Sequence, residues 1–229
     1  TTSGRSVSNF GVQAPSAWGV ATGGGVTVAV VDTGVAYENY AGEPLDLFAP
    51  YQQAPDLAGA TFVPGYDFAN SDTHPNDDNS HGTHVTGTIA QTTNNAYGVA
   101  GIAFNASIMP VKVLDALGMG YDSDVAAGIR WAVDNGAKII NMSLGGSSGS
   151  QALQEAIDYA QTGDVLVVCA AGNDGAGQVS YPARYPWCIA VGATRFDGAR
   201  VAYSNYGTDL DLVAPGGDTS RDQNRDGYG

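Results

Sequence analysis

Five short apolar runs, rich in valine and isoleucine, alternate along this chain with stretches of helical pattern. The runs occupy residues 26–32, 107–114, 137–143, 164–170 and 188–193. Their apolar residues follow one another instead of alternating with polar ones, which is typical of strands buried on both faces of a parallel sheet. We therefore expect an α/β fold with right-handed crossovers and helices on both faces of the sheet.

Three helices are predicted between these strands, over residues 80–91, 123–135 and 150–162. Asn79 or Ser80 is expected to be the N-cap of the first, and a glycine follows each of the other two, as is common at helix ends. The residues expected to face the sheet are Val125, Ile129, Ala132 and Val133 in the second helix, and Leu153, Ile157, Tyr159 and Ala160 in the third.

Composition limits the function classes. The net charge of −14 argues against binding to nucleic acid, and no apolar run reaches the 18 residues that a membrane span needs. The 229 residues fit one domain, 1–229, with 1–11 as a polar N-terminal extension of the kind that remains after a leader is removed. The two cysteines, Cys169 and Cys188, have no CxxC spacing; two buried thiols and one disulfide both remain open.

Chemically useful residues follow the predicted strands. Asp32 ends the first strand, residues 143–146 (SLGG) follow the third, Asn173 follows the fourth, and His81 opens the first helix. Since parallel α/β sheets hold their chemistry beyond the carboxyl ends of the strands, these residues are expected to meet at one rim. A carboxylate orients an imidazole base, an amide donates to an oxyanion, and glycine-rich backbone pairs with an extended peptide. The pattern indicates acyl transfer on a polypeptide.

Several motifs in this order resemble the subtilisin-like serine proteases, the subtilase family. They are VAVVDTGV, HGTHVTGTIA, NMSLGG, VVCAAGNDG, YPARYP and DLVAPG, and the resemblance runs from about Val12 to Gly216. It implies a subtilisin-like three-layer fold with a mainly parallel central sheet, and a secreted serine endopeptidase. It also assigns His81 as the base, Asp32 as the carboxylate that orients it, and Asn173 as the oxyanion donor.

The nucleophile motif of that family, a GTSMA-like stretch after APG, is absent from the sequence. Ser143 and Ser220 do not fit the role, because one ends the substrate-binding strand and the other has no apolar helix behind it. We expect the fold to lack its C-terminal part, with 217–229 as a surface loop and a companion C-terminal fragment carrying the serine. A pro-segment inhibitor is a further expected partner. The alternative is a catalytically inactive binding module on the same fold.

Other enzyme classes fit less well. An aspartic protease would need two DTG loops in an all-β chain. A dinucleotide-binding domain would need its glycine motif after the first strand, whereas the three glycines at 23–25 precede that strand. A zinc site at His81 and His84 lacks a third nitrogen or thiolate ligand. His84 is therefore expected to point into the domain as a structural hydrogen-bonding residue.

Calcium is the expected cofactor, at three candidate sites. The first resembles a calcium loop of the thermitase-like branch of the family and would use Asp67, Asn70, Asp72, His74 and Asn76. The second, where the family has its strong site, would use Asp56, Asn95 and carbonyls of Thr93, Tyr97 and Val99. The third, Asp222, Asn224 and Asp226, matches the start of an EF-hand-like loop.

The resemblance also predicts the substrate pockets. The pocket for the residue before the cut would lie between Ala170, Ala171 and Gly172, the segment Ser143, Leu144, Gly145 and Gly146, and Ser180. Leu114, Gly118, Gly120 and Leu144 would line the neighbouring subsite. The pocket-lining residues are small and none is acidic, which favours large apolar side chains in the substrate. Asp122 adds a weak preference for basic substrate residues farther from the cut.

Overall fold

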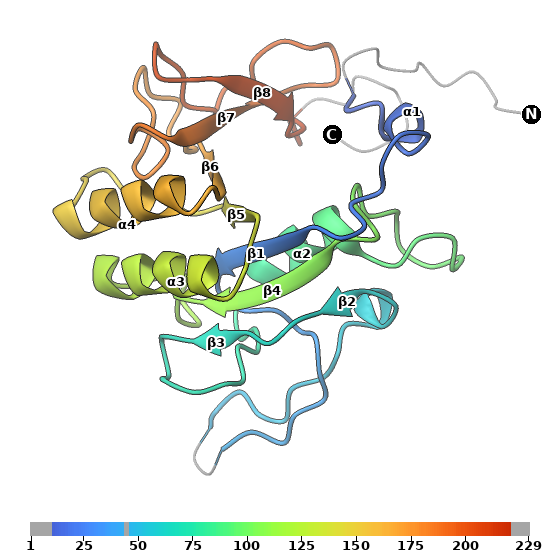
Figure 1. Cartoon of the computed structure of the whole chain (residues 1–229). Helices are drawn as coiled ribbons and strands as arrows, with labels where there is room; N and C mark the ends of the chain where they lie inside the picture. The colour runs from blue at the N-terminus through green and yellow to red at the C-terminus, as the bar shows by residue number, and fades with distance from the viewer. Residues whose placement is uncertain (1–10, 44–45, 221–229) are drawn as a thin grey trace, which may run out of the picture.

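The structure is a computed structural model, which describes residues 11–43 and 46–220. Within them, eight parallel strands form one sheet (Figure 1). The main order is β2-β4-β1-β5-β6-β7-β8, and β3 also pairs with β4. The predicted α/β class with a mainly parallel sheet is confirmed.

The five predicted strands are all present; four are one to three residues shorter than predicted and β7 is one residue longer. They are β1 (Thr27–Asp32), β4 (Ser107–Lys112), β5 (Ile139–Met142), β6 (Leu166–Ala170) and β7 (Cys188–Thr194). Three strands were missed, namely β2 (Thr61–Phe62), β3 (Tyr66–Asp67) and β8 (Leu212–Pro215). They are too short to show a hydrophobic period, and their pairing to β4 and β7 fixes them instead.

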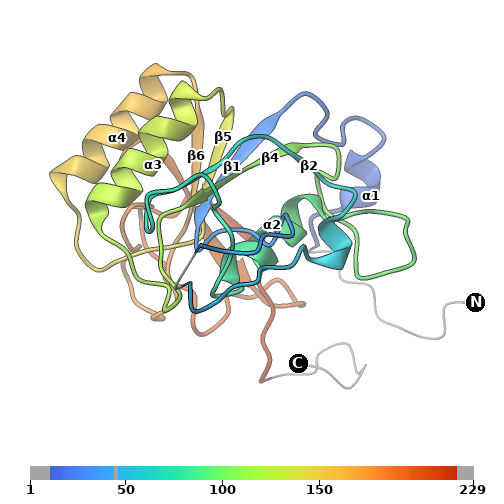
Figure 2. The same cartoon turned by 90° about the horizontal axis from the view of Figure 1, so that it is seen from below.

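The helices flank both faces of the sheet. The three predicted helices are α2 (His81–Ala90), α3 (Asp122–Asp134) and α4 (Gln151–Thr162), and short helical turns α1 (Ala14–Ala17) and η1 (Pro55–Leu57) precede them. Figures 1 and 2 show α3 and α4 together on one face, with α2 on the other. Tyr159, predicted to face the sheet, is instead partly exposed and donates its hydroxyl hydrogen to Asp134.

Two apolar clusters show how β1 and β4 divide their side chains between the faces. Ala29 and Val31 belong to a large cluster with Ile129 and Ile157, from α3 and α4. Val28 and Val30 belong to a smaller cluster with Ala90 of α2. Successive strand residues point to opposite faces, so this half of the sheet is covered on both sides.

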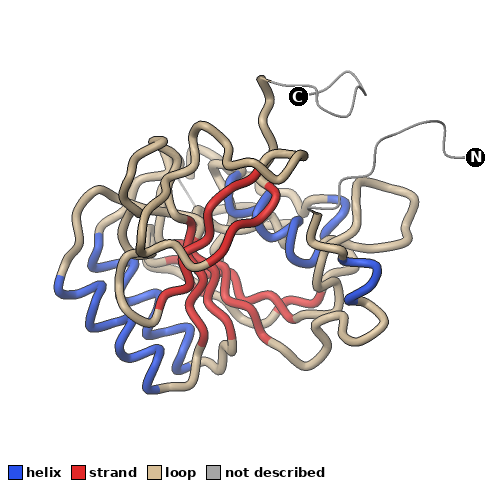
Figure 3. Tube along the Cα trace, turned by 90° about the horizontal axis from the view of Figure 1, so that it is seen from above, coloured by secondary structure: helices blue, strands red, loops and turns tan. Residues whose placement is uncertain are grey.

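The half of the sheet formed by β5 to β8 is covered differently. One face packs against α3 and α4 through residues such as Ile140 and Val167. The other face carries Leu166, which is 44% exposed, and Leu212, which is 56% exposed. Figure 3 looks along the sheet from the side where β7 and β8 lie in Figure 1, with helices to both sides of the strands. At the β5 end of this face, Ile139 still packs against the smaller cluster beside α2.

The described residues show the state of the two cysteines and contain no membrane-spanning helix. Cys169 and Cys188 are free thiols, the first buried and the second partly exposed, so the disulfide is not formed. No helix in the described part of the chain is long and apolar enough to cross a membrane. The proposed extension at 1–11 falls almost wholly outside the described residues, as do 221–229 of the predicted loop.

Candidate active site

Asp32 and His81, 49 residues apart in the sequence, meet beyond the carboxyl end of β1. Nδ1 of His81 lies 2.8 Å from Oδ1 of Asp32, and since a carboxylate accepts, the imidazole carries its hydrogen on Nδ1. Asp32 is fully buried, whereas the His81 side chain is 49% exposed. This leaves the other ring nitrogen, Nε2, as the proton acceptor on the accessible side of the ring.

The Asp32 carboxylate is held in a dry environment. Burial raises its pKa above the usual range, while the hydrogen bonds from His81 and from the Thr33 amide, at 2.7 Å, lower it. Its second oxygen, Oδ2, is buried and has no hydrogen-bond partner among the described residues. A carboxylate in this setting gains from a nearby positive charge, which an imidazolium at His81 would supply.

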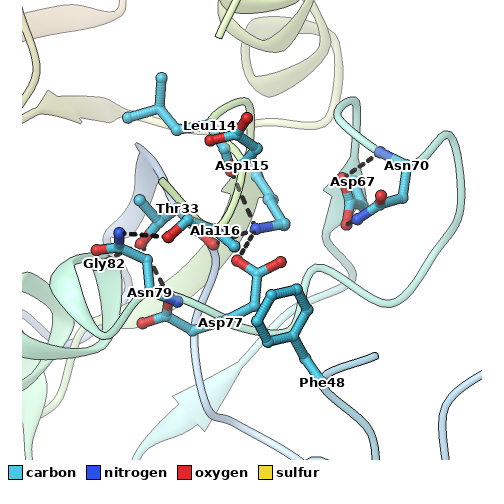
Figure 4. Close-up of polar contacts among 12 residues, drawn as sticks. Thr33, Phe48, Asp67, Asn70, Asp77, Asn79, Gly82, Leu114, Asp115 and Ala116 are labelled. Atoms are coloured by element: carbon cyan, nitrogen blue, oxygen red, sulfur yellow. Dashed lines mark hydrogen bonds and ion pairs between the residues drawn. The ribbon is translucent and has the colours of Figure 1, made fainter. Parts of the chain in front are cut away.

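Asn79, one of the two predicted N-caps, accepts a hydrogen bond from the His81 amide at 3.3 Å at the start of α2, whereas Ser80 does not cap the helix. Ser80 occupies the N-cap position, but its backbone is left-handed, at φ 93°, and its side chain makes no capping bond. Instead the Asp77 carboxylate accepts hydrogen bonds from the Ser80 and Thr83 amides, and Thr33 Oγ1 accepts one from Gly82. Figure 4 shows this bond between Gly82 and Thr33. Asp77 lies in the loop just before α2, and its carboxylate reaches the backbone amides of the first helical turn.

A groove of about 570 Å³ opens beside His81. Its lining includes residues predicted to bind substrate, namely Leu114, Gly118, Gly120, Ser143, Leu144, Gly145 and Gly146, together with Asp122. Gly146 and Tyr181 pair as antiparallel backbone, with N–O distances of 2.8 and 3.0 Å. The exposed side chains of Leu117 and Met119 also line the groove, and the sequence analysis missed them because exposure follows from the fold.

A second hollow, of about 360 Å³, lies at the end of β6 on the less covered face of the sheet. Ala170, Ala171, Gly172 and Asn173 line it, and Ser143 lines both this hollow and the groove. Ser180 lies between the two glycine segments: a Cβ on Gly172 would come within 2.3 Å of Ser180 Oγ. Asn173 is exposed, so its amide is accessible to a ligand.

Neither serine weighed as a nucleophile is bonded to the imidazole. Within the described residues, no hydroxyl makes a hydrogen bond with Nε2 of His81. Ser143 Oγ accepts from Asn141, and Ser220 bonds Asp218. The expectation for His84 was wrong: it is exposed, and no hydrogen bond of its ring is found among the described residues. Three positions after His81 on α2, it points away from the apolar face.

The first calcium loop brings its oxygen-bearing residues together. Asp67 is 1% exposed, and its carboxylate accepts from the Asn70 amide and the Asn70 side chain at 2.8 and 2.9 Å. Asp72 accepts from the His74 amide, and Asn76 Oδ1 is buried without a partner. Burial raises the pKa of Asp67, while the two hydrogen bonds from Asn70 lower it and only partly offset the burial.

The second calcium loop also holds an orphaned oxygen. Asn95 donates to one oxygen of Asp56 at 2.6 Å, while Asp56 Oδ2 is buried without a partner. Gly98, at φ 58°, lies so close that a Cβ there would fall 2.0 Å from this oxygen. No group of three His, Cys, Asp or Glu side chains gathers as a metal site in the part described, and Asp222, Asn224 and Asp226 lie outside it.

A parallel α/β sheet with a carboxylate–imidazole pair at its rim, beside a peptide-sized groove, defines a subtilisin-like α/β protein. The sequence model of the subtilase family matches residues 23–228, and the chain belongs to this family. The resemblance inferred from the motifs is thereby confirmed.

The curated relatives are longer than this chain. Thermitase of Thermoactinomyces vulgaris is 44% identical over 90% of this chain and 68% of its own length, and subtilisin Savinase of Lederbergia lenta is 46% identical over 90% and 69%. The chain spans about half, 49%, of an alkaline protease of Alkalihalobacillus alcalophilus.

Solved structures agree with the fold. A structure of proteases from Pseudoalteromonas arctica superposes with a TM-score of 0.79 at 37% identity, covering 93% of this chain and 69% of that one. A cold-adapted subtilisin-like serine proteinase superposes at 0.72 and 36% identity, covering 86% and 64%. These likenesses support the fold class independently of the motifs.

Proposed function

We propose that this chain supplies the base, its orienting carboxylate and the oxyanion donor of a serine endopeptidase of subtilisin type. The observation that carries the proposal is the 2.8 Å hydrogen bond between His81 and the buried Asp32, with the free edge of the ring beside a groove. His81 removes the proton from a serine hydroxyl, Asp32 stabilises the imidazolium, and Asn173 donates to the oxyanion.

The serine is proposed to come from a segment outside residues 1–229, as on a companion C-terminal fragment. Supporting this, the face of β5 to β8 that carries Leu166 and Leu212 is open, and Nε2 of His81 has no hydroxyl partner among the described residues. A parallel sheet is stable when both faces are covered, so a segment packing here would both complete the core and deliver a hydroxyl to the rim.

A serine-directed fluorophosphonate, read by intact mass, tests this proposal. The protein in its natural assembly is expected to be labelled on a serine outside residues 1–229, while His81→Ala in the same assembly is not labelled. His84→Asn, on the same helix and exposed, is the matched control and should label normally. If the whole natural assembly resists the reagent, the inactive binding module is favoured instead, since it needs the groove but no nucleophile.

We propose broad specificity for large apolar residues before the cut. The pocket walls at Ala170–Gly172 and Gly145 are small, and Ser180 between them is neutral. In the groove, Leu114 and Leu144 offer apolar contacts, whereas Asp122 at its far edge adds a single acid. Cleavage of a mixed peptide library, scored by mass spectrometry, tests this ranking; a dominant preference for arginine or lysine would overturn it.

Calcium is proposed as the cofactor, holding the loops around Asp67 and Asp56. The residues fit the ion, because each loop contains a carboxylate and one buried oxygen without a hydrogen-bond partner, on Asn76 and on Asp56 itself. Rotation of the Asn70 amide would turn its oxygen toward the Asp67 side, and hard oxygen ligands are those that calcium prefers. Bound there, the ion would supply positive charge that offsets the burial of these carboxylates. The loop of Asp222 remains a weaker proposal.

Secretion, and inhibition by a pro-segment, complete the proposed function. The likeness to thermitase and to subtilisin Savinase supports an extracellular role. A pro-segment would occupy the same groove as the substrate and so protect the cell before export. Detection of the protein in culture medium tests the first proposal, and inhibition of its labelling by an added subtilase pro-segment tests the second.

A further inference from the structure

Lys112, the last residue of β4, is a buried cation beneath the candidate active site. The chain has two lysines, and they differ completely in setting: the Lys112 side chain is 1% exposed, whereas Lys138 is on the surface. Lysine is almost never fully buried unless it is paired. The other residues of the stretch SIMPVKVL are uncharged and would pack without an ammonium group. The buried lysine therefore calls for a specific explanation.

All three hydrogens of the ammonium have an acceptor. Nζ donates to the Thr33 carbonyl at 2.7 Å, to Asp78 Oδ1 at 2.6 Å and to the Leu114 carbonyl at 3.0 Å. The Asp78 side chain is itself only 7% exposed. The three acceptors come from three separate segments: the turn after β1, the loop before α2 and the wall of the substrate groove.

Each of these segments holds a part of the site. Thr33 donates its amide hydrogen to Asp32 and, through Oγ1, accepts from the Gly82 amide next to His81. Asp78 is adjacent to Asp77, whose carboxylate caps α2 at Thr83. Figure 4 shows Thr33 lying between Gly82 and the Leu114–Ala116 segment. The Asp32 carboxylate is thus linked to the ammonium through Thr33, and the backbone beside His81 is linked to it through Thr33 and Gly82.

We propose that Lys112 is a positioning residue for the Asp32–His81 pair. Its ammonium fixes Thr33 and Asp78 relative to each other, and these two fix Asp32 and the first turn of α2. Lys112 is too deeply buried to touch substrate, so it acts only through these residues. Its catalytic consequence rests on the proposed function, while its effect on the pair is measurable in the chain itself.

The test replaces Lys112 and reads the site locally. In Lys112→Met, amide hydrogen exchange at Thr33, Gly82 and Thr83 is expected to accelerate at least about tenfold relative to exchange at Ala171, and the downfield Nδ1 proton resonance of His81 to weaken or disappear. Lys138→Met, the matched control, should change neither. In the complete enzyme, fluorophosphonate labelling of Lys112→Met should slow by about ten- to a hundredfold, because small displacements of reacting groups cost this much.

A second variant separates positioning from bulk stability. Lys112→Met leaves the buried Asp78 carboxylate unpaired, so it could unfold the chain; Lys112→Met with Asp78→Leu removes both charges, a change that folded proteins often tolerate. The double variant is expected to fold but to keep the fast exchange at Thr33 and Gly82. Normal exchange and a normal Nδ1 resonance there would overturn the proposal, and so would unfolding of both variants, which would make the role purely structural. Absence of labelling in wild type would count against the proposed function alone.

Discussion

The two sides of the rim are built in opposite ways. On the Asp32–His81 side, side chains from β1, β4 and the loop before α2 bond one another, and Asp32 and Lys112 are buried. On the Ala170–Asn173 side, small residues line an open hollow, and Asn173 is exposed. The first side is held mainly by hydrogen bonds among its own side chains, although Asp32 Oδ2 has no partner among the described residues. The second offers surface on which something else is expected to pack.

The largest expected effect concerns the catalytic pair. In the complete enzyme, His81→Ala or Asp32→Asn is expected to lower kcat/KM for a peptide substrate by about 10⁴-fold, since each removes proton transfer or orients the imidazole wrongly. Asn173→Ala, on the open side, should cost about 10²–10³-fold, the effect of one oxyanion donor. Steady-state kinetics measure both, with His84→Asn as the control. An equal loss for Asn173→Ala and His81→Ala would contradict this ranking.

A matched pair of core substitutions tests the coverage of the sheet. Ile140→Ala, at a fully buried position, should lower the free energy of unfolding of the chain by about 2–5 kcal/mol. Leu212→Ala, at a position 56% exposed, should change it by less than about 0.5 kcal/mol. Urea unfolding gives both values.

The same two substitutions can be compared in the complete protein, where the free energy of unfolding shows whether a further segment covers the face of Leu212. If a further segment packs on the face that carries Leu212, then Leu212→Ala destabilises the assembly while leaving the chain unchanged. Equal small effects in chain and assembly would show that this face stays open, which would favour the binding module over the enzyme.

Calcium is expected to strengthen only the Asp32–His81 side, because both candidate loops lie in the segment before β4. Added at 100 times its dissociation constant to chelator-treated protein, it should raise the free energy of unfolding by about 2.7 kcal/mol per site. Asp67→Asn and Asp56→Asn should each remove one site's share, whereas Asp158→Asn, on the exposed side of α4, should remove none. An unchanged unfolding midpoint on adding calcium to wild type would refute the cofactor proposal.

The smallest effect is a pH dependence from Asp32. Burial raises its pKa in the folded state, so its contribution to stability is fully present below its unfolded pKa and is lost as pH rises through the folded pKa. The free energy of unfolding of wild type minus that of Asp32→Asn should therefore fall with pH across this window, by at most about 1.4 kcal/mol per pH unit. Asp158→Asn should run parallel to wild type. A difference that grew with pH would mean that the folded pKa is lowered.

The sequence by itself determined the parallel sheet, the three helices and the family. Continuous apolar runs separated by helical patterns favour a parallel sheet, and motifs such as HGTHVTGTIA carry their resemblance within a few adjacent residues. It also singled out Asp32 and His81, which the structure brings into contact. Strands of two residues, β2 and β3, were out of reach because two residues carry no period.

Only the tertiary structure decided how these parts hold one another. Lys112 meets Thr33 across 79 residues of sequence, and Asp77 rather than Ser80 caps α2, since capping depends on where a loop folds back. The exposure of His84 and of the β5 to β8 face likewise follows from which neighbours are present. Local patterns fix what a segment becomes, whereas burial and hydrogen bonding between distant segments are properties of the packed chain.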